Sequence, residues 1–301
     1  GSEANELALR LAFTFSGQKD VIVLEEAYHG NTISNIGISP YKHNGPGGEG
    51  PPDWVHEIPM PYLYRGVYRD PETAGILYSD KVSAICEKLA ELGRKPAAFI
   101  CESILGCGGQ VTLPNNFLKM SYQHVRKLGG LCIADEIQVG FGRTGKHMWA
   151  FELQGVVPDI VTLGKPIGNG YPLGAVITTR EIAEAFANGM EYFNTFGGSQ
   201  ISSAVGMAVL DVMENERLMQ NSFENGRLLK YSLDKLKKTS PLIGDVRGEG
   251  YFLGIEFVLD LETKEPAPLH AEYVVERMKS SRILLSTEGP GKNVVKFKPP
   301  M

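Results

Sequence analysis

The sequence predicts an α/β protein whose central sheet is mostly parallel. Short apolar runs typical of buried strands recur along the chain, and segments with apolar residues at helical spacing separate them. Glycine and proline clusters divide these segments from one another. At 301 residues and 43% hydrophobic content, the chain has enough apolar mass for one large domain or two unequal domains.

The first part of the chain alternates helices with strands. Leu7 and Leu11 lie at helical spacing and predict a helix over 3–15. Further helices are expected at 80–93 and 116–128, and strands at 20–25, 97–101, 131–135, 159–163 and 173–178. The stretch 40–75 is rich in Pro and Gly and contains Trp54 and several tyrosines, so we expect a long loop that lines a site.

The pattern changes after two further helices, expected at 180–188 and 200–238. A strand-forming run over 247–258, a helix at 270–281 and a strand at 293–298 follow. We therefore divide the chain into a large domain, 1–238, and a partial small domain, 239–301. Because residue 1 is not Met and the chain stops after a strand-like run, we expect a fragment that is truncated at both ends.

Composition excludes several classes of function. The 30 basic and 35 acidic residues give a net charge of −5, and no Lys/Arg run marks a nucleic-acid or membrane surface. The four cysteines lack CxxC spacing and read as buried free thiols, while the six histidines show no metal-ligand spacing, so no metal site is expected. Two GxGxxG matches, at 45–50 and 140–145, lie outside a strand-to-helix turn, which argues against a dinucleotide site.

Two polar residues follow buried strands in positions that suit a site. Asp135 ends the strand 131–135, at the edge of the sheet where ligands bind in α/β proteins, although it also suits a helix cap. Lys165 follows the strand 159–163 among glycines, where partial burial favours a neutral, nucleophilic amine. A lone lysine there is more often a surface residue.

The chain begins with a third feature, Gly1-Ser2-Glu3-Ala4-Asn5, which opens an amphipathic helix with Ser2 as the expected N-cap. The free N–H groups of a helix start attract phosphate. Together with an Asp and a Lys at two strand ends, it offers partners for a phosphate, a ring nitrogen and an aldehyde. Pyridoxal 5′-phosphate (PLP) has these three groups.

Motifs along nearly the whole chain resemble the class III (ornithine/ω-amino acid) aminotransferases, which are fold type I PLP enzymes. The motifs, in order, are Gly1–Asn5, Tyr28-His29-Gly30, Glu102 with Gly106, Gly108 and Gly109, Asp135–Gly145, Gly164-Lys165, Asn194–Gly198 and Arg247–Gly250. The resemblance implies a PLP-binding large domain with a mostly parallel sheet, and a homodimer with its site at the interface.

The resemblance also implies roles for individual residues. Lys165 binds the cofactor covalently and moves the substrate proton, Asp135 pairs with the ring nitrogen, and Gln138 contacts the ring hydroxyl. Tyr28 lies on the ring face, next to His29. The cofactor phosphate is held by Gly1 and Ser2, with Thr195 added from the second subunit.

Within the family, the stretches 39–42, 54–57, 64–69, 191–195 and 285–290 are most similar to phospho-lyases that act on O-phosphoethanolamine or 5-phosphohydroxy-L-lysine. Lys296 stands where transaminases of the group carry a carboxylate-binding arginine, and we expect Lys296 and Lys298 to form part of a phosphate-accepting patch or to be solvated edge lysines. An ω-amino acid or alanine–glyoxylate type transaminase is the alternative, and an inactive PLP-binding or interaction fragment is a second. We expect a soluble intracellular protein, cytoplasmic or mitochondrial.

Overall fold

The computed structural model describes residues 1–301 and contains two main sheets of different size and a two-stranded hairpin. The larger sheet has the strand order β2-β1-β3-β6-β7-β8, and all neighbours are parallel except β7 and β8. Its strands are β1 (Asp20–Leu24), β2 (Val55–Ile58), β3 (Pro96–Glu102), β6 (Leu131–Asp135), β7 (Ile160–Leu163) and β8 (Ala175–Thr178). The expected α/β fold with a mostly parallel sheet is confirmed.

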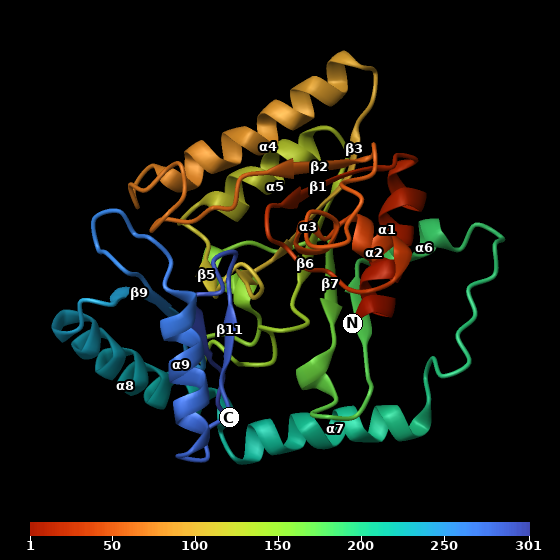
Figure 1. Ribbon diagram of the computed structural model, residues 1–301. Helices are drawn as coiled ribbons and strands as arrows, with labels where there is room; N and C mark the ends of the chain where they lie inside the picture. Colours follow the sequence, from red (N-terminus) through yellow and green to blue (C-terminus); the bar gives the residue numbers. More distant parts are fainter.

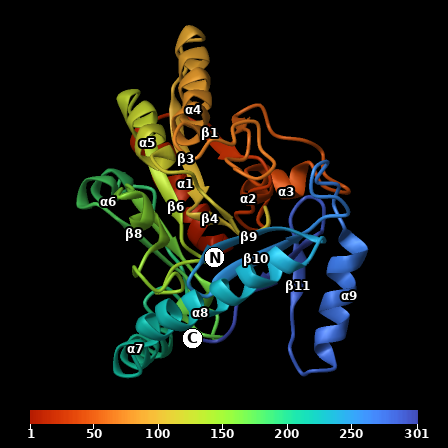
Figure 2. The ribbon, with the colours of Figure 1, turned by 90° about the vertical axis from the view of Figure 1, so that its left-hand side faces the viewer.

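Helices cover both faces of this sheet (Figures 1 and 2). One face packs against α4 (Ala74–Glu91) and α5 (Phe117–Lys127), and the other against α1 (Ser2–Ser16), with α6 (Arg180–Phe186) beside it. Alternate residues of β3 divide between two cores: Phe99 packs toward α5, and Ala98 packs toward α1. The central strands β1, β3, β6 and β7 are therefore buried on both faces, as their continuous apolar runs require.

The smaller sheet has the order β11-β12-β10-β9 and is antiparallel. It consists of β9 (Ile243–Glu249), β10 (Phe252–Phe257), β11 (Ser286–Glu288) and β12 (Val294–Phe297). Leu233 of α8 (Leu218–Thr239) and Ala271 of α9 (Pro268–Lys279) pack together on one face of it. Because α8 joins this core, the division at residue 238 separates a helix from the sheet it covers; the domain boundary stays a prediction.

Two expected elements differ from the structure. The stretch 40–75 is not loop throughout: it contains α3 (Pro40–His43) and the edge strand β2, whose polar His56 and Glu57 obscure the strand pattern. The single helix expected over 200–238 is two helices, α7 (Gln200–Asn215) and α8. They separate where Arg217 adopts a left-handed conformation, with φ of 53°.

The shorter elements complete the chain. They are α2 (Ile33–Gly37), the hairpin strands β4 (Ile104–Leu105) and β5 (Val111–Thr112), and the 3₁₀ turns η1 (Ala150–Gln154) and η2 (Lys165–Ile167). All four cysteines are free, and three of them are buried. None of the helices is both long and apolar enough to cross a membrane.

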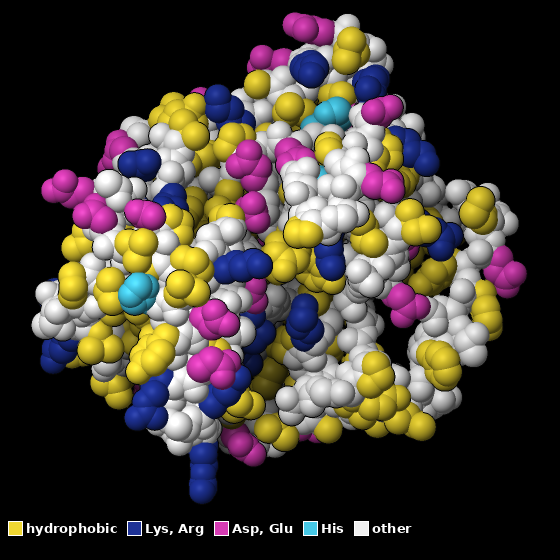
Figure 3. Space-filling view, in the orientation of Figure 1, with side chains coloured by type: hydrophobic (Ala, Val, Ile, Leu, Met, Phe, Trp, Pro, Cys, Tyr) yellow, Lys and Arg dark blue, Asp and Glu magenta, His cyan; other side chains and the backbone are white.

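The segment 187–199 runs outward from α6 and returns to α7 (Figure 1). Phe193 and Phe196 are 76% and 79% exposed there, and α7 buries none of its residues. Figure 3 shows an open gap between this segment and the body of the protein. In a single chain, these apolar side chains therefore have no partner surface.

Candidate active site

The carboxyl ends of β3, β6 and β7 meet beside the start of α1 and enclose a cavity of about 260 Å³. Its lining includes seven of the eight residues that the sequence singled out: Gly1, Ser2, Tyr28, His29, Asp135, Gln138 and Lys165, together with Gly30, Glu102 and Ile137. The parallel sheet accounts for this convergence, because parallel strands end at the same edge. The roles of these residues remain predictions.

Asp135 is the last residue of β6 and is 4% exposed. Its carboxylate accepts hydrogen bonds from Asn5 Nδ2 at 2.8 Å, from His29 Nδ1 at 2.8 Å and from the Ile137 amide at 3.1 Å. Asn5 Nδ2 also donates to the His29 carbonyl at 2.7 Å. These bonds fix the carboxylate without any Lys or Arg partner.

Asn5 was not assigned a role from the sequence. The available signal was a polar residue on the buried face of α1, between Ala4 and Ala8. Its partner lies 130 residues along the chain, so only the folded sheet reveals the contact.

Glu102 is a second buried acid in the cavity wall. It lies opposite Asp135 in the register of the neighbouring strands β3 and β6. It accepts hydrogen bonds from the backbone amides of Tyr28 at 3.2 Å and Gly106 at 3.0 Å. Burial raises the pKa of Glu102 to about 7; His29 opposes this shift and Asp135 adds to it. The sequence placed Glu102 in a motif but gave it no role.

The start of α1 packs closely against the turn that follows β1. Gly30 has φ of 135°, and a Cβ atom there would lie 2.7 Å from Ser2 Oγ, so only glycine fits. Ser2 is the first helical residue and Gly1 is the N-cap, which corrects the expected cap. The Ser2 hydroxyl accepts the Asn31 amide hydrogen at 3.1 Å instead of capping its own helix.

Lys165 follows Gly164 at the end of β7, and its backbone has φ of 37°, in the left-handed region. Such a conformation costs about 1–3 kcal/mol and is concentrated at functional sites. Its side chain is exposed in the single chain, so the expected partial burial is wrong. Lys165 lines two neighbouring cavities, of about 260 and 570 Å³, which leave its side chain accessible.

Tyr28 lies at the cavity wall and is half-buried. The ring of Tyr41 packs edge-on against it at 6.0 Å. Burial is the main cause that raises the pKa of Tyr28, and Cys107 adds to the shift. Tyr41 and Lys42 belong to the 40–75 stretch, so part of that stretch does lie near the site.

Thr195 is the one predicted site residue outside the cavity. It is exposed in the turn of segment 187–199, which runs outward from α6 and returns to α7. Asn194 of the same turn lines a neighbouring cavity of about 570 Å³, which shares Gly1 and Lys165 with the first.

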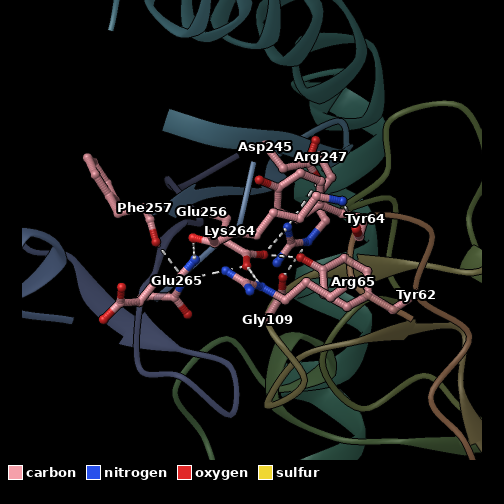
Figure 4. Close-up of polar contacts among 12 residues, drawn as sticks. Tyr62, Tyr64, Arg65, Gly109, Asp245, Arg247, Glu256, Phe257, Lys264 and Glu265 are labelled. Carbon is pink, nitrogen blue, oxygen red and sulfur yellow. Dashed lines mark hydrogen bonds and ion pairs between the residues drawn. The ribbon is translucent and has the colours of Figure 1, made fainter. Parts of the chain in front are cut away.

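A second buried polar cluster joins the smaller sheet to the cavity wall (Figure 4). We call Tyr62, Arg65, Asp245, Arg247, Glu256 and Asn293 the interdomain cluster. Arg247 Nη1 donates to Glu256 at 2.8 Å, and Arg247 Nε donates to the Gly109 carbonyl at 2.8 Å. Arg65 and Tyr62 also donate to Glu256. The loop that carries Gly106 and Gly109 is thus hydrogen-bonded both to Glu102 in the cavity wall and to Arg247 of the interdomain cluster.

The whole chain, residues 1–301, matches the family Aminotransferase class-III. It is 50% identical to "Alanine--glyoxylate aminotransferase 2-like" from Drosophila melanogaster, over 100% of this chain and 62% of that protein. The chain belongs to the class III aminotransferase family. It is also 43% identical to "Ethanolamine-phosphate phospho-lyase homolog 1" from Caenorhabditis elegans, over 100% of this chain and 67% of that protein.

Among solved structures, a phospholyase from Arthrobacter in complex with phosphoethanolamine superimposes with a TM-score of 0.93 at 36% identity. The match covers 100% of this chain and 70% of that one. An amine transaminase from an uncultivated Pseudomonas species, solved in its PLP-bound form, matches with a TM-score of 0.89 at 29% identity. The chain spans 62% of the length of its Drosophila relative.

PLP is the cofactor of the class III family, and the cavity suits it. Asp135 is a buried acceptor without a cationic partner, as a protonated ring nitrogen needs, and His29 Nε2 is buried with no hydrogen-bond partner. Gly1 and Ser2 place a helix start at one side, where a phosphate fits. Lys165 supplies an amine at the mouth.

Proposed function

We propose that the protein is a PLP-dependent phospho-lyase that removes phosphate from a small phosphorylated amine, O-phosphoethanolamine or 5-phosphohydroxy-L-lysine. The products are an aldehyde, ammonia and phosphate. The observation that carries this choice is the ion pair of Lys296 with Glu288, at the position where the family resemblance implies a carboxylate-binding arginine in transaminases. That pairing occupies the group that would hold a substrate carboxylate.

The names of two similar proteins support the same choice, since one from Caenorhabditis elegans and one from Arthrobacter are called phospho-lyases. The name of the Drosophila relative favours a transaminase of the alanine–glyoxylate type instead. Both reactions begin at the same carbon, so one site serves either of them.

The residues of the cavity have different roles in this reaction. When bound, PLP supplies an electron sink for the carbon that carries the substrate amine. Asp135 would hold the ring nitrogen and favour its protonated form, and the helix start at Gly1 and Ser2 would hold the cofactor phosphate. Lys165 Nζ takes the proton from the carbon bearing the amine. The bond between the adjacent carbon and the phosphate oxygen then breaks, and its electrons leave with the phosphate.

The elimination leaves a carbon–carbon double bond next to the amine nitrogen. Water hydrolyses this product to the aldehyde and ammonia, so no oxidant or keto acid is consumed. A transaminase, in contrast, needs a keto acid to accept the amino group and complete its cycle.

The deciding experiment incubates the full-length protein with PLP and O-phosphoethanolamine and without a keto acid. We expect phosphate and ammonia to appear in equal amounts, and Lys165→Ala to release neither. A strict requirement for pyruvate or glyoxylate would show a transaminase. Protein that takes up no yellow colour from PLP, or whose colour resists borohydride, would show an inactive or interaction fragment.

We propose further that two copies of the chain form a homodimer through α7 and the segment 187–199. Phe193 and Phe196 are exposed there, and Thr195 between them would reach the cofactor phosphate of the second copy. Sedimentation of the full-length protein tests this: Phe193→Asp should give a monomer, while Leu92→Asp, an exposed change at the end of α4, should not.

We also propose a cytoplasmic or mitochondrial location. Relatives from Arabidopsis thaliana, 42% identical, and Homo sapiens, 39% identical, carry "mitochondrial" in their names. Imaging the tagged full-length protein beside a mitochondrial marker separates the two compartments.

A further inference from the structure

Basic side chains gather around Gln138 at the mouth of the cavity without acidic partners. Lys298 Nζ lies 3.4 Å from Gln138 Oε1 and forms no ion pair. Arg143 donates to the Pro299 carbonyl at 2.6 Å, which places its guanidinium beside the residue that follows Lys298. Lys165 lines the same cavity as Gln138. Figure 3 shows Lys and Arg side chains facing the hollow between the two parts of the molecule.

The two lysines of the expected patch differ in their surroundings. Lys296 is paired with Glu288, and this pair leaves no net charge for a ligand. Lys298, two residues on, faces Lys296, Arg143 and Lys165, and Glu288 is the one acid near it. Partial burial and these three cations lower the pKa of Lys298 to about 8. An excess of positive charge at one spot of an acidic protein favours an anion.

We propose that Lys298 and Arg143 form the subsite for the phosphate group of the substrate. The proposal rests on the phospho-lyase function and adds which residues select the substrate. A phosphate monoester carries a charge of about −1.5 to −2 at pH 7 and three acceptor oxygens. Arg143 presents a planar guanidinium to two oxygens, and Lys298 offers a point charge.

The location agrees with the chemistry of the leaving group. In O-phosphoethanolamine two carbons separate the amine from the phosphate, so a substrate amine beside Lys165 brings its phosphate to the same cavity mouth. Positive charge fixed at that position stabilises the phosphate more strongly as it leaves. The subsite therefore serves both binding and elimination.

Titration of Lys298 adds a pH dependence with a definite sign. Its amine carries charge below pH 8 and loses it above, so phosphate binding weakens as the pH rises from about 7 to about 9. The charged groups that face it are Lys296, Arg143, Lys165 and Glu288. A bound phosphate itself raises the pH at which the Lys298 amine loses its charge.

The test measures binding of inorganic phosphate to the full-length holoenzyme by calorimetry, with kcat/KM for O-phosphoethanolamine as a second readout. Lys298→Met should weaken phosphate binding about tenfold and remove the pH dependence that the wild-type protein shows. Lys298→Arg should retain binding at pH 9. The matched control is Lys238→Met, an exposed lysine on α8, which should change neither quantity.

Phosphate affinity of Lys298→Met equal to that of the wild-type protein would overturn the subsite. Ethanolamine, which lacks the phosphate, should bind both proteins equally. A difference would show that Lys298 affects binding of the amine instead, and it would also overturn the phosphate subsite. A wild-type holoenzyme that binds phosphate but releases none from O-phosphoethanolamine would contradict the lyase, while the affinity loss in Lys298→Met would still establish the anion subsite.

Discussion

The cavity and the interdomain cluster both bury carboxylates, but they neutralise them in opposite ways. In the cluster, Glu256 meets two guanidinium groups, from Arg65 and Arg247. In the cavity, Asp135 and Glu102 accept hydrogen bonds from amides and from His29, and no Lys or Arg touches either of them. Glu256 already has cationic partners within the chain, whereas the buried acids of the cavity leave room for a cation.

The difference separates stability from function. A buried ion pair whose partners come from the same chain costs free energy when one member is removed. A buried carboxylate without a cation costs free energy while it stays charged, and recovers it when a positive group binds. Both regions bond to the loop around Gly106 and Gly109, so the cluster holds one wall of the cavity in place.

The largest expected effect is on activity and comes from Asp135, the buried acid that no Lys or Arg contacts. Asp135→Asn keeps the shape but loses the charge, so it should lower kcat/KM for O-phosphoethanolamine about 10³-fold, with a small change in the free energy of unfolding. Steady-state assays and urea unfolding measure the two quantities.

The control for that prediction lies at the other end of the sheet. Asp159 precedes β7, accepts hydrogen bonds from Arg126 and from the Cys132 amide, and is remote from the cavity. Asp159→Asn should reduce stability and leave kcat/KM unchanged. Equal activity losses in both variants would remove the special role of Asp135.

The next effect is on stability and comes from Glu256, the buried acid that Arg65 and Arg247 contact. Glu256→Gln leaves the buried Arg247 and the half-buried Arg65 without their shared carboxylate, so we expect a loss of about 3–5 kcal/mol in the free energy of unfolding. Denaturant titration measures it. Activity of the protein that stays folded should fall much less than in Asp135→Asn; the reverse order would contradict the division drawn above.

A smaller effect concerns pH and Glu102. Its folded-state pKa of about 7 lies above the ordinary value of 4.5, so the folded state holds the proton more tightly. This contribution to stability is present below pH 4.5 and is lost as the pH rises through 7. Glu102→Gln cannot ionise. Relative to the wild-type protein, it should therefore gain about 2 kcal/mol between pH 5 and pH 8. A stability difference that stays constant over this range would show that Glu102 ionises normally.

The smallest effect is expected at the rim of the interdomain cluster. Lys264 Nζ donates to the Tyr64 carbonyl at 2.7 Å and lies 4.4 Å from the centre of the Tyr64 ring, but it is partly exposed. Lys264→Met should cost less than about 1 kcal/mol of unfolding free energy. A loss as large as that of Glu256→Gln would extend the cluster to this residue.

Sequence patterns were sufficient for the parts of the fold that repeat a local rule. Buried strands such as Leu131–Asp135 are continuous apolar runs, and because parallel strands end at one edge, Asp135 and Lys165 could be placed together. The strand Val55–Ile58 was missed, since an edge strand carries polar residues like any loop.

Other features depend on contacts between distant residues and left no local signal. The residues of the interdomain cluster come from the loop around Tyr62, from β9 and β10 of the smaller sheet, and from Asn293 just before β12. The left-handed Arg217 interrupts a sequence that contains neither Gly nor Pro at that point. The exposure of Lys165 follows from the open cavity rather than from its apolar neighbours in sequence.

The hydrogen bonds of Asn5 have a consequence for the order of folding. They connect the first helix to the end of β6, 130 residues later in the sequence, and β1 and β3 lie between these two elements along the chain. Contacts of such long range form late, because a large loop must close first. A chain with an unfinished large sheet has no cofactor pocket, so the uptake of PLP colour during refolding would report the completion of that sheet.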